Sequence, residues 1–394
     1  MSKRYRLYIR NFTFKAIATI ERVVPKDRKL ILMTSWLGEK YIDNSKYVYE
    51  FLQSYSEYDA VWMTNNIRVY KDLKNRKLSV CKFHSLKGIW YQLRARVVFS
   101  SIQFADYNPW LVNRCLYIDL GHGHPIKDPG KEHFTEESRL IDSLVLNKID
   151  YYAIVASDFA KRLYTQVIDI PLNKILISDF ARNDVFIDAS LRDGKNQLIQ
   201  EMRKHYSKVI TYMPTHRGMG KKVMAINDIL PIDKLQSFCE RYNFLFVIKK
   251  HFYHREEIEN LDKYPNIVDI TNVEDVDPQV LLYQTDLLIT DYSACYIDYM
   301  LLNRPMLFYQ FDIAEFASKE RSLYMSFTEL NIAPVSLDQD ALIRDLDSLI
   351  NEPVDLFAER RNEFAKTYFN NLHQQDGRKK VVDIMQKLLN EQAK

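Results

Sequence analysis

The stretch that most constrains the fold of this chain runs from Asp286 to Asp312, DLLITDYSACYIDYMLLNRPMLFYQFD. It begins with an apolar run at 287–290 and continues through a polar turn at 291–293. Apolar residues at helical spacing follow, and a second apolar run occupies 306–309. A strand, a tight turn, a helix and a second strand, in that order, are typical of a parallel sheet with crossover helices. The stretch therefore predicts an α/β fold.

The turn at 291–293 is also a candidate phosphate site. Ligands of parallel sheets bind at the carboxyl ends of strands, where a helix N-terminus offers unpaired N–H groups and a partial positive charge to an anion. Ser293 lies close to the predicted start of the helix. An ordinary capped turn explains the same residues, because Ser and Asp cap helices in many proteins. The stretch alone leaves both interpretations open.

The composition excludes several classes of protein. Apolar residues make up 47% of the 394 positions and charged residues 27%, which is typical of a globular protein. Gly (9) and Pro (12) are scarce, which argues against a disordered chain. A net charge of +3 is too small to indicate nucleic-acid binding, so we expect no nucleic-acid partner. The four cysteines lack metal-ligand spacing, which predicts buried thiols in a reducing compartment and no metal centre.

Strands and helices alternate along the chain in two successive halves. In the first half we predict strands at 30–33, 59–63, 80–83, 95–99, 116–120, 154–157 and 175–177. In the second half we predict them at 209–212, 244–248, 267–270, 287–290 and 306–309, before closing helices. A helical pattern at 196–206 leads out of the first half. The prediction is two doubly wound, Rossmann-like domains, 1–205 and 206–394, that face a cleft.

The first segment of the chain is basic and roughly amphipathic. Residues 1–29 carry many Lys and Arg, and their apolar positions fit a helical stripe only approximately. Such a segment can lie on an anionic membrane surface, or it can be a solvated helix packed on the first domain. No run of 18 apolar residues and no signal-peptide core is present. We expect a cytoplasmic protein, peripheral to the cytoplasmic face of the membrane if the segment binds lipid.

A histidine flanked by glycines follows the predicted strand at 116–120. Glycine lets the backbone approach a ligand closely, and His transfers protons near neutral pH. His122, between Gly121 and Gly123, is therefore a candidate catalytic base, although a polar turn is the alternative. His122 and His124 do not predict a metal site, because no acidic residue or Cys stands at ligand spacing.

Two strand ends in the second half carry cations. Thr215 and Arg217 follow the strand at 209–212, and Arg can make two parallel hydrogen bonds to a phosphate. Lys250 and His251 follow the strand at 244–248. A surface Arg and a solvated strand end are the alternatives. If the domains face a cleft, these strand ends converge there and form a site for a phosphate-bearing donor from His122, Arg217, Lys250, His251 and Ser293. No GxxxxGK[ST] loop is present, which argues against P-loop chemistry.

Four segments, in order, resemble motifs of the CDP-glycerol glycerophosphotransferases, the teichoic acid primases and polymerases. GHGHPIKDPG is similar to the family's W-H-G-T-P-L-K-x-x-G, YMPTHRG to its Y-A-P-T-x-R, and VIKKHF to its R-x-H-P. The stretch from Asp286 to Asp312 resembles its L-I-T-D-Y-S-S-x-x-x-D-x-x-x-L-x-R-P-x-x-F-Y. An earlier loop, Gly38 to Asn44, resembles its G-x-x-Y-x-x-N. The resemblance extends over most of both predicted domains.

The resemblance implies a GT-B-like fold of two Rossmann-like domains, the second of which binds the donor. It implies transfer of glycerol phosphate from CDP-glycerol, or of ribitol phosphate from CDP-ribitol, to a hydroxyl of a lipid-linked or polymeric glycan acceptor, with release of CMP. No cofactor beyond the CDP-activated donor is expected. The residues carried over from the motifs are His122 and His251 as catalytic residues, Thr215, Arg217, Lys250, Thr290, Ser293 and Ala294 around the donor, and Gly38, Asn44, His124 and Lys127 in acceptor or loop positions.

The chain departs from the motifs at four positions. Gly121 replaces a Trp, His124 a Thr, Phe252 a Pro, and Ala294 the second Ser. These changes leave the donor open between CDP-glycerol and CDP-ribitol. They also leave open primase or polymerase activity, and a Gram-positive wall polymer or a Gram-negative capsule as the product. A GT-B glycosyltransferase that uses a nucleotide sugar, and a non-catalytic binding module, are the alternative functions.

Overall fold

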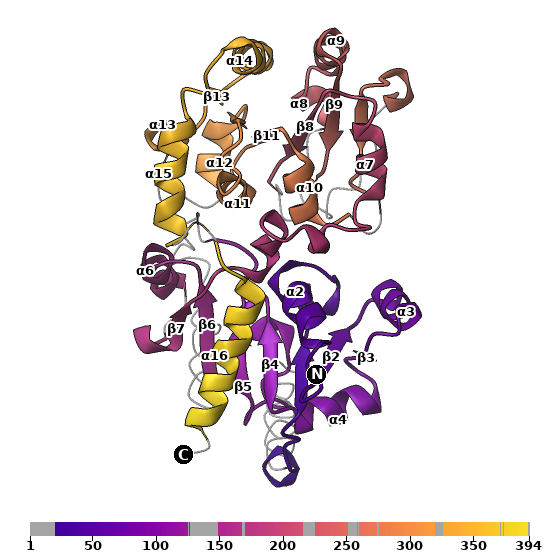
Figure 1. Ribbon diagram of the computed structural model, residues 1–394, viewed down its shortest axis with the longest axis vertical. Helices are drawn as coiled ribbons and strands as arrows, with labels where there is room; N and C mark the ends of the chain where they lie inside the picture. The colour runs from indigo at the N-terminus through magenta and orange to yellow at the C-terminus, as the bar shows by residue number, and fades with distance from the viewer. Residues whose placement is uncertain are drawn as a thin grey trace, which may run out of the picture. The chain divides into compact units, whose positions relative to one another are not determined.

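The chain folds into two compact units, and Figure 1 shows their helices and strands. The computed structural model describes residues 20–124, 126, 149–167, 170–215, 225–250, 258, 260–273, 276–319, 326–370, 372 and 374–392. Unit 1 consists of Met1–His122, Gly130–Asp184 and Gln375–Lys394. Unit 2 consists of Gly123–Pro129 and Val185–Gln374.

The structure divides the chain at a different place from the predicted boundary near residue 205. The second segment of unit 1 ends at Asp184, and the helix α7 (Gln197–Arg203) already belongs to unit 2. The C-terminal helix α16 (Gly377–Glu391) returns to unit 1. The Asp184 carboxylate accepts the backbone N–H groups of Gly377 at 2.8 Å and Arg378 at 2.9 Å. This buried carboxylate holds the first turn of α16 on unit 1, so the two units are not consecutive halves of the sequence.

Unit 1 is built on a seven-stranded parallel sheet in the order β3-β2-β1-β4-β5-β6-β7. Its strands are β1 (Leu30–Met33), β2 (Asp59–Thr64), β3 (Val80–Lys82), β4 (Val97–Ser100), β5 (Leu116–Asp119), β6 (Asp150–Val155) and β7 (Ile175–Ile177). Its helices, besides α16, are α2 (Asp43–Leu52), α3 (Ile67–Asn75), α4 (Leu86–Arg94) and α6 (Asp158–Val167). All seven strands match predicted ones to within a few residues, because central parallel strands are apolar runs bounded by polar turns.

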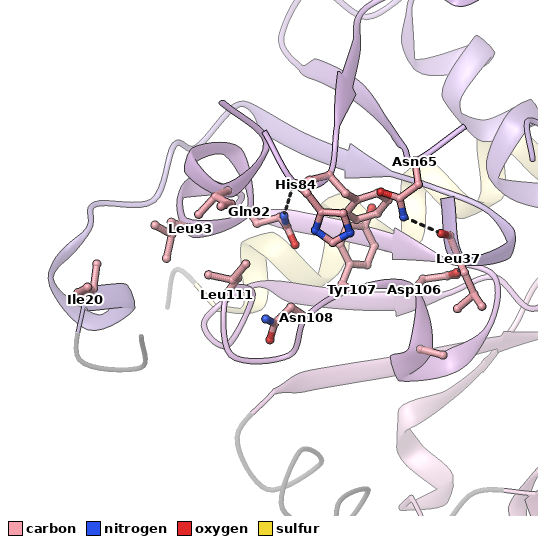
Figure 2. A pocket seen from close by; sticks show the side chains of 13 residues that line it. Ile20, Leu37, Asn65, His84, Gln92, Leu93, Asp106, Tyr107, Asn108 and Leu111 are labelled. Carbon is pink, nitrogen blue, oxygen red and sulfur yellow. Dashed lines mark hydrogen bonds between the residues drawn. The ribbon is translucent and has the colours of Figure 1, made fainter. Parts of the chain in front are cut away.

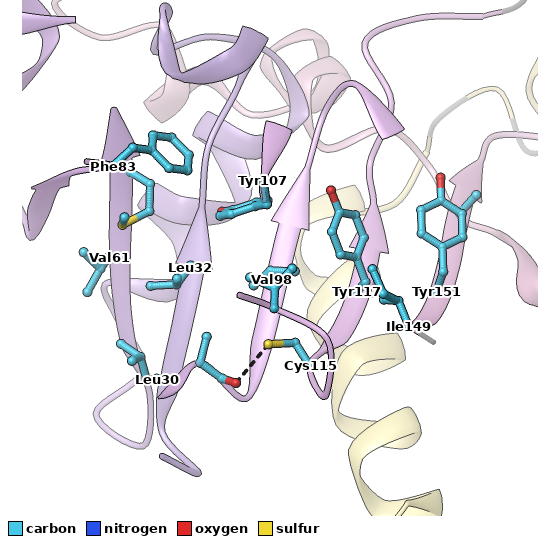
Figure 3. Close-up of a cluster of buried hydrophobic side chains, with 14 of the residues drawn as sticks. Leu30, Leu32, Val61, Phe83, Val98, Tyr107, Cys115, Tyr117, Ile149 and Tyr151 are labelled. Carbon is cyan, nitrogen blue, oxygen red and sulfur yellow. Dashed lines mark hydrogen bonds between the residues drawn. The ribbon is translucent and has the colours of Figure 1, made fainter. Parts of the chain in front are cut away.

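The core of unit 1 lies against this sheet. Figure 3 shows side chains from successive strands in one buried cluster, including Leu32 from β1, Val98 from β4 and Tyr117 from β5. Cys115 belongs to the same cluster, and burial raises the pKa of its thiol to about 11. Its Sγ donates to the Ala95 carbonyl at 3.1 Å. The expectation of a buried thiol is confirmed here and at Cys81 and Cys239, whereas Cys295 is partly exposed.

Unit 2 repeats the plan with a six-stranded parallel sheet in the order β10-β9-β8-β11-β12-β13. Its strands are β8 (Lys208–Met213), β9 (Phe244–Ile248), β10 (Ile267–Asp269), β11 (Leu287–Thr290), β12 (Met306–Tyr309) and β13 (Val335–Ser336). Its further helices are α8 (Ile226–Ile229), α9 (Ile232–Tyr242), α10 (Pro278–Gln284), α11 (Cys295–Met300), α12 (Ile313–Lys319), α13 (Phe327–Leu330), α14 (Gln339–Asn351) and α15 (Ala358–Tyr368). The short β13 was not predicted, because two residues carry no readable alternation.

Each sheet has one point at which the order of its strands reverses. In unit 1 this switch lies between β1 and β4, and in unit 2 between β8 and β11. Loops diverge at such a point and leave room for a ligand at the carboxyl ends of the strands. Within the described parts of the chain, no helix is both long and apolar enough to cross a membrane.

Candidate active site

The loop after β1 has an unusual backbone. Trp36, Leu37 and Gly38 all have positive φ values, of 51°, 58° and 79°. Gly38 adopts this conformation readily because it has no side chain, and a Cβ there would lie 2.8 Å from the Phe83 ring. The Leu37 N–H donates to Asp106 Oδ1 at 2.7 Å, which ties the loop to the segment after β4. Positive φ values in two non-glycine residues are strain of the kind that clusters at functional sites.

His122 follows β5, is exposed to solvent and has a defined ring orientation. Its Nδ1 lies 2.8 Å from the Ser101 carbonyl oxygen. A carbonyl can only accept a hydrogen bond, so Nδ1 carries the proton and the neutral ring keeps the lone pair on Nε2. The Trp36 ring packs beside the imidazole, with the ring centroids 5.1 Å apart. This is the tautomer that a general base requires.

Asp106 fixes the segment that orients His122. Its Oδ2 accepts the backbone N–H of Ser101 at 2.6 Å and that of Ile102 at 2.9 Å. Burial raises the pKa of the Asp106 carboxyl, although its backbone hydrogen bonds oppose that rise. Through these contacts one carboxylate positions both the carbonyl that holds His122 and, through Leu37, the strained loop after β1.

A buried ion pair lies beneath the His122 turn. Arg182 Nη1 donates to Asp43 Oδ1 at 2.8 Å and to the His122 backbone carbonyl at 2.7 Å. The two side chains are 6% and 13% exposed, respectively. The other oxygen of Asp43 accepts from Trp36 Nε1 at 2.5 Å. The Arg182–Asp43 pair therefore connects the histidine turn with the tryptophan that packs on its ring.

Asn44 ties the same turn to the loop after β7. Its Nδ2 donates to the carbonyls of Leu120 at 2.9 Å and Gly121 at 3.3 Å, and its Oδ1 accepts the Arg182 backbone N–H at 3.1 Å. The side chain is buried. Asn44, predicted in an acceptor or loop position, thus holds the backbone that presents His122.

A third carboxylate, that of Asp119, supports this turn. Asp119 Oδ2 accepts from the hydroxyls of Tyr151 at 2.9 Å and Tyr164 at 2.5 Å. Its Oδ1 accepts the Gly121 N–H at 3.1 Å. Burial raises the pKa of both tyrosines well above the usual range, so they stay protonated and donate. The residue before the turn is thereby fixed on both of its carboxylate oxygens.

At the switch point of unit 2, Asp291 shapes the turn after β11. Its Oδ1 accepts the backbone N–H of Thr215 at 2.7 Å and that of Tyr292 at 2.5 Å. The Tyr292 ring stacks on Phe316, with ring centroids 3.7 Å apart. The structure thus joins the ends of β8 and β11, and it brings Thr215 to the same turn as Ser293.

Thr290 and Ser293 have different environments at this turn. Thr290 is buried, and its hydroxyl donates to the Met213 carbonyl at 2.7 Å, which links β11 to β8. Ser293 and Ala294 are partly exposed, and Ala294 is the residue that precedes α11. Burial raises the pKa of the neighbouring Cys295 thiol to about 11, so it is protonated at neutral pH. Of these residues, Ser293 has a partly exposed hydroxyl, which accepts the Cys295 backbone N–H at 3.5 Å.

Lys250 does not present a solvent-exposed cation. It is buried at the end of β9, and its Nζ forms an ion pair with Asp269 Oδ2 at 3.0 Å. Its backbone N–H donates to the Thr271 hydroxyl at 2.9 Å. Asp269 is the last residue of the neighbouring strand β10, so the pair fixes two strand ends relative to each other. Any charge that Lys250 offers a donor is reduced by this carboxylate.

His124 lies apart from His122 in its packing. Its ring is buried against Tyr368 and Phe369, with centroid distances of 5.1 and 4.7 Å, at the end of α15 in unit 2. Three predicted site residues, Lys127, Arg217 and His251, lie outside the described residues. Among the described residues no group of three or more His, Cys, Asp or Glu is arranged to hold a metal ion.

Sequence reasoning missed the residues that orient His122. Asp43 stands inside the recognised Gly38–Asn44 loop, and Arg182 follows the last strand of unit 1, yet neither has a local pattern that singles it out. Because the two residues are 139 positions apart in the sequence, local patterns cannot show that they form a pair. The available signal was an Arg a few residues after a strand end of a Rossmann-like sheet, between Asp179 and Asp184.

The family model described as CDP-glycerol:poly(glycerophosphate) glycerophosphotransferase matches residues 16–387 of the chain. A teichoic acid glycerol-phosphate transferase of Staphylococcus aureus is 24% identical over 382 residues, which cover 90% of this chain and 91% of the relative. A teichoic acid ribitol-phosphate primase of Bacillus spizizenii is 30% identical over 248 residues, or 60% of this chain and 59% of the relative.

A solved structure shares the fold over nearly the whole chain. The wall teichoic acid polymerase TagF superposes with a TM-score of 0.75 at 22% identity, covering 99% of this chain and 97% of that chain. The predicted GT-B-like α/β fold of two Rossmann-like units is confirmed, and so is the resemblance that the motifs indicated.

Proposed function

The chain belongs to the CDP-glycerol:poly(glycerophosphate) glycerophosphotransferase family, and from this premise we propose that it uses CDP-glycerol to extend or prime a teichoic-acid-type polymer. It is an enzyme that transfers a polyol phosphate from a CDP-activated donor to an acceptor hydroxyl and releases CMP. The observation that supports this chemistry best in the structure is the His122 ring, which is held through Nδ1 and keeps Nε2 for the acceptor proton.

We propose glycerol phosphate, rather than ribitol phosphate, as the transferred group. The family model that matches residues 16–387 is described by CDP-glycerol, and the glycerol-phosphate transferase of Staphylococcus aureus matches 90% of this chain. Match length does not separate the two donors, because the ribitol-phosphate polymerase TarK of Staphylococcus aureus matches 94% of this chain. The description of the family model therefore supports CDP-glycerol as the proposed donor.

The proposed reaction is a direct displacement at phosphorus. The acceptor hydroxyl oxygen bonds to the phosphorus that carries glycerol, and its proton passes to His122 Nε2. The bond between this phosphorus and the bridging oxygen breaks, and CMP leaves with that oxygen. The reaction uses no cofactor beyond the donor, because fixed cations and N–H groups can stabilise the phosphate charge that develops.

We assign the donor phosphates to unit 2. Thr215 and Ser293 follow β8 and β11, and the Asp291 carboxylate between the two segments accepts the backbone N–H groups of Thr215 and Tyr292. Arg217 and His251 follow the ends of β8 and β9 in sequence and are proposed to neutralise the leaving CMP. Lys250 is proposed to affect the donor site indirectly, through Asp269, because its ammonium group is already paired with that carboxylate.

We further propose that the acceptor is lipid-linked and that the enzyme works at the cytoplasmic face of the membrane. A CDP-activated donor is an intracellular metabolite, and the basic segment 1–29 suits an anionic lipid surface. The acceptors that the enzyme uses in vitro distinguish a wall polymer from a capsule as the product. They also distinguish primase from polymerase activity.

A donor screen tests the proposed function. The full chain is incubated with CDP-glycerol, CDP-ribitol, or CMP- and UDP-sugars together with a glycerol-phosphate-terminated acceptor, and the product mass is measured. We expect an added mass of one glycerol phosphate and stoichiometric CMP with CDP-glycerol. Transfer of a sugar would contradict the proposal, and binding of CDP-glycerol without product would indicate a binding module.

Replacing Ser293 by Ala is expected to raise the KM for CDP-glycerol by about tenfold, because one hydrogen bond to a charged group contributes roughly 1.5–3 kcal/mol. Ala294 stands where the family has a second Ser, so no neighbouring hydroxyl compensates for the loss. Initial rates at varied CDP-glycerol measure the effect, and Ser326→Ala, a serine that caps α13, is the matched control. A change below twofold would show that the backbone N–H groups of the turn suffice.

A further inference from the structure

Unit 1 contains a cavity of about 630 Å³ that the proposed reaction does not use. Figure 2 shows the side chains around it, which come from α4, the loop after β1 and the segment after β4. The apolar part of the wall includes Ile20, Leu37, Phe83, Ile89, Leu93 and Leu111, and the polar residues Asn65, His84, Gln92, Asp106 and Asn108 complete the lining together with Ala105 and Tyr107. Its volume lies within the range of about 300–1,000 Å³ that is usual for small-molecule sites. Walls of this kind suit a hydrocarbon better than a sugar or a nucleotide.

The helix α4 presents two large apolar residues, Leu86 and Trp90, to solvent beside this cavity. It approaches the sheet through Gly88, where a Cβ would lie 2.0 Å from the Lys82 carbonyl oxygen, and through the buried amide of Gln92. Leu86 and Trp90, by contrast, are 89% and 47% exposed. An amphipathic helix normally buries such residues, so their exposure marks an interaction surface. The apolar wall therefore continues from the cavity onto the outer face of α4.

The cavity is also connected to the proposed base. Leu37 forms part of its wall and belongs to the strained loop after β1. The preceding residue, Trp36, packs on the His122 ring. Asp106 lines the cavity as well and positions the carbonyl that orients His122. A ligand held in the cavity thus lies against the same two segments that present the base.

Two lysines near the start of α4 favour an anionic head group. Lys82 and Lys87 are exposed on either side of the start of α4. The Lys87 ammonium lies 5.2 Å from the Tyr91 ring centroid, which holds it near the helix surface. Cations next to exposed Leu and Trp side chains are typical of surfaces that contact phosphate-bearing lipids.

We propose that this cavity binds the hydrocarbon chain of the lipid-linked acceptor and so delivers the acceptor head group to His122. The proposal rests on the proposed function, since it names the part of the substrate that this cavity takes. The chain of the acceptor is preferred over that of a bulk phospholipid because Leu37 and Asp106 join the cavity to the His122 segments.

The test compares two acceptors with the same glycerol-phosphate head group, one with a long hydrocarbon chain and one with a short, water-soluble chain. CMP release gives the KM for each with the full chain. The wild-type enzyme is expected to have at least a tenfold lower KM for the long-chain acceptor. Ile89→Asp places a carboxylate in the wall at a 37% exposed position and should remove most of that ratio. Ala105→Trp, which fills the cavity without a charge, should do the same.

Leu172→Asp is the matched control, because Leu172 is 57% exposed on unit 1 away from the cavity residues, and it should keep the wild-type ratio. Equal KM values for the two acceptors in the wild type would overturn the proposal, while turnover of the short-chain acceptor would still support the proposed function. A second arm measures binding to phosphatidylglycerol vesicles without acceptor. If Ile89→Asp weakens vesicle binding but keeps the KM ratio, the cavity takes a phospholipid chain, and the assignment to the acceptor is wrong.

Discussion

Replacing His122 by Ala is expected to lower kcat for CMP release by about 10²–10⁴-fold, which is the usual contribution of a positioned general base. The reason is geometric. His122 Nδ1 lies 2.8 Å from the Ser101 carbonyl, so the proton is fixed on that nitrogen and Nε2 is available to accept the acceptor's proton. Alanine removes the proposed base but leaves the backbone that Arg182 and Asn44 hold.

The substitution is suited to a test because His122 is exposed and the folded core does not depend on its side chain. The midpoint of urea unfolding should therefore stay close to that of the wild type. His205→Ala, an exposed histidine of unit 2, is the matched control and should keep full activity. The KM for CDP-glycerol should change little, because the donor is assigned to unit 2. Turnover within threefold of the wild type would refute the assignment of His122 as the base.

The strands and their order of appearance were predictable because local patterns determine them. The runs predicted at 244–248 and 306–309 coincide with β9 and β12. These elements are apolar runs or helical repeats bounded by polar turns, so a short window contains the information. The packing of these elements was not predictable. The sequence of α4 does not indicate that the helix buries Gly88 and exposes Leu86.

The domain boundary and the residues that hold the His122 turn were not predictable, because both depend on contacts between residues that are distant in the sequence. The return of α16 to unit 1 is fixed by Asp184, which contacts Gly377 across 193 positions. The Arg182 contact with the His122 carbonyl spans 60 positions. Local spacing predicts which strand ends carry chemistry, because sheet topology gathers those ends. Local spacing does not predict which charged residue after a strand is buried and holds the backbone at His122.

Replacing Arg182 by Met is expected to destabilise the folded protein by about 3–5 kcal/mol, because the Asp43 carboxylate would remain buried without its partner. The Arg182 side chain is 6% exposed and that of Asp43 is 13% exposed, so water cannot replace the ion pair easily. Urea unfolding of the full chain measures the loss. Arg182→Lys keeps the positive charge and should recover most of the stability. A destabilisation below 1 kcal/mol for the Met variant would contradict the structure of this pair.

The same substitution tests whether Arg182 positions the base. Because Arg182 donates to the His122 carbonyl, its loss frees the turn, and a displacement of about 1 Å can lower kcat by roughly 10²-fold. Adding Asp43→Asn to Arg182→Met removes the unpaired carboxylate, and Asn tolerates the positive φ of 62° at that position. The double variant should therefore regain stability, yet kcat should stay low because the His122 carbonyl still lacks its donor. If kcat recovers together with stability, Arg182 supports only the fold, and the orientation of His122 must come from Ser101 and Asn44 alone.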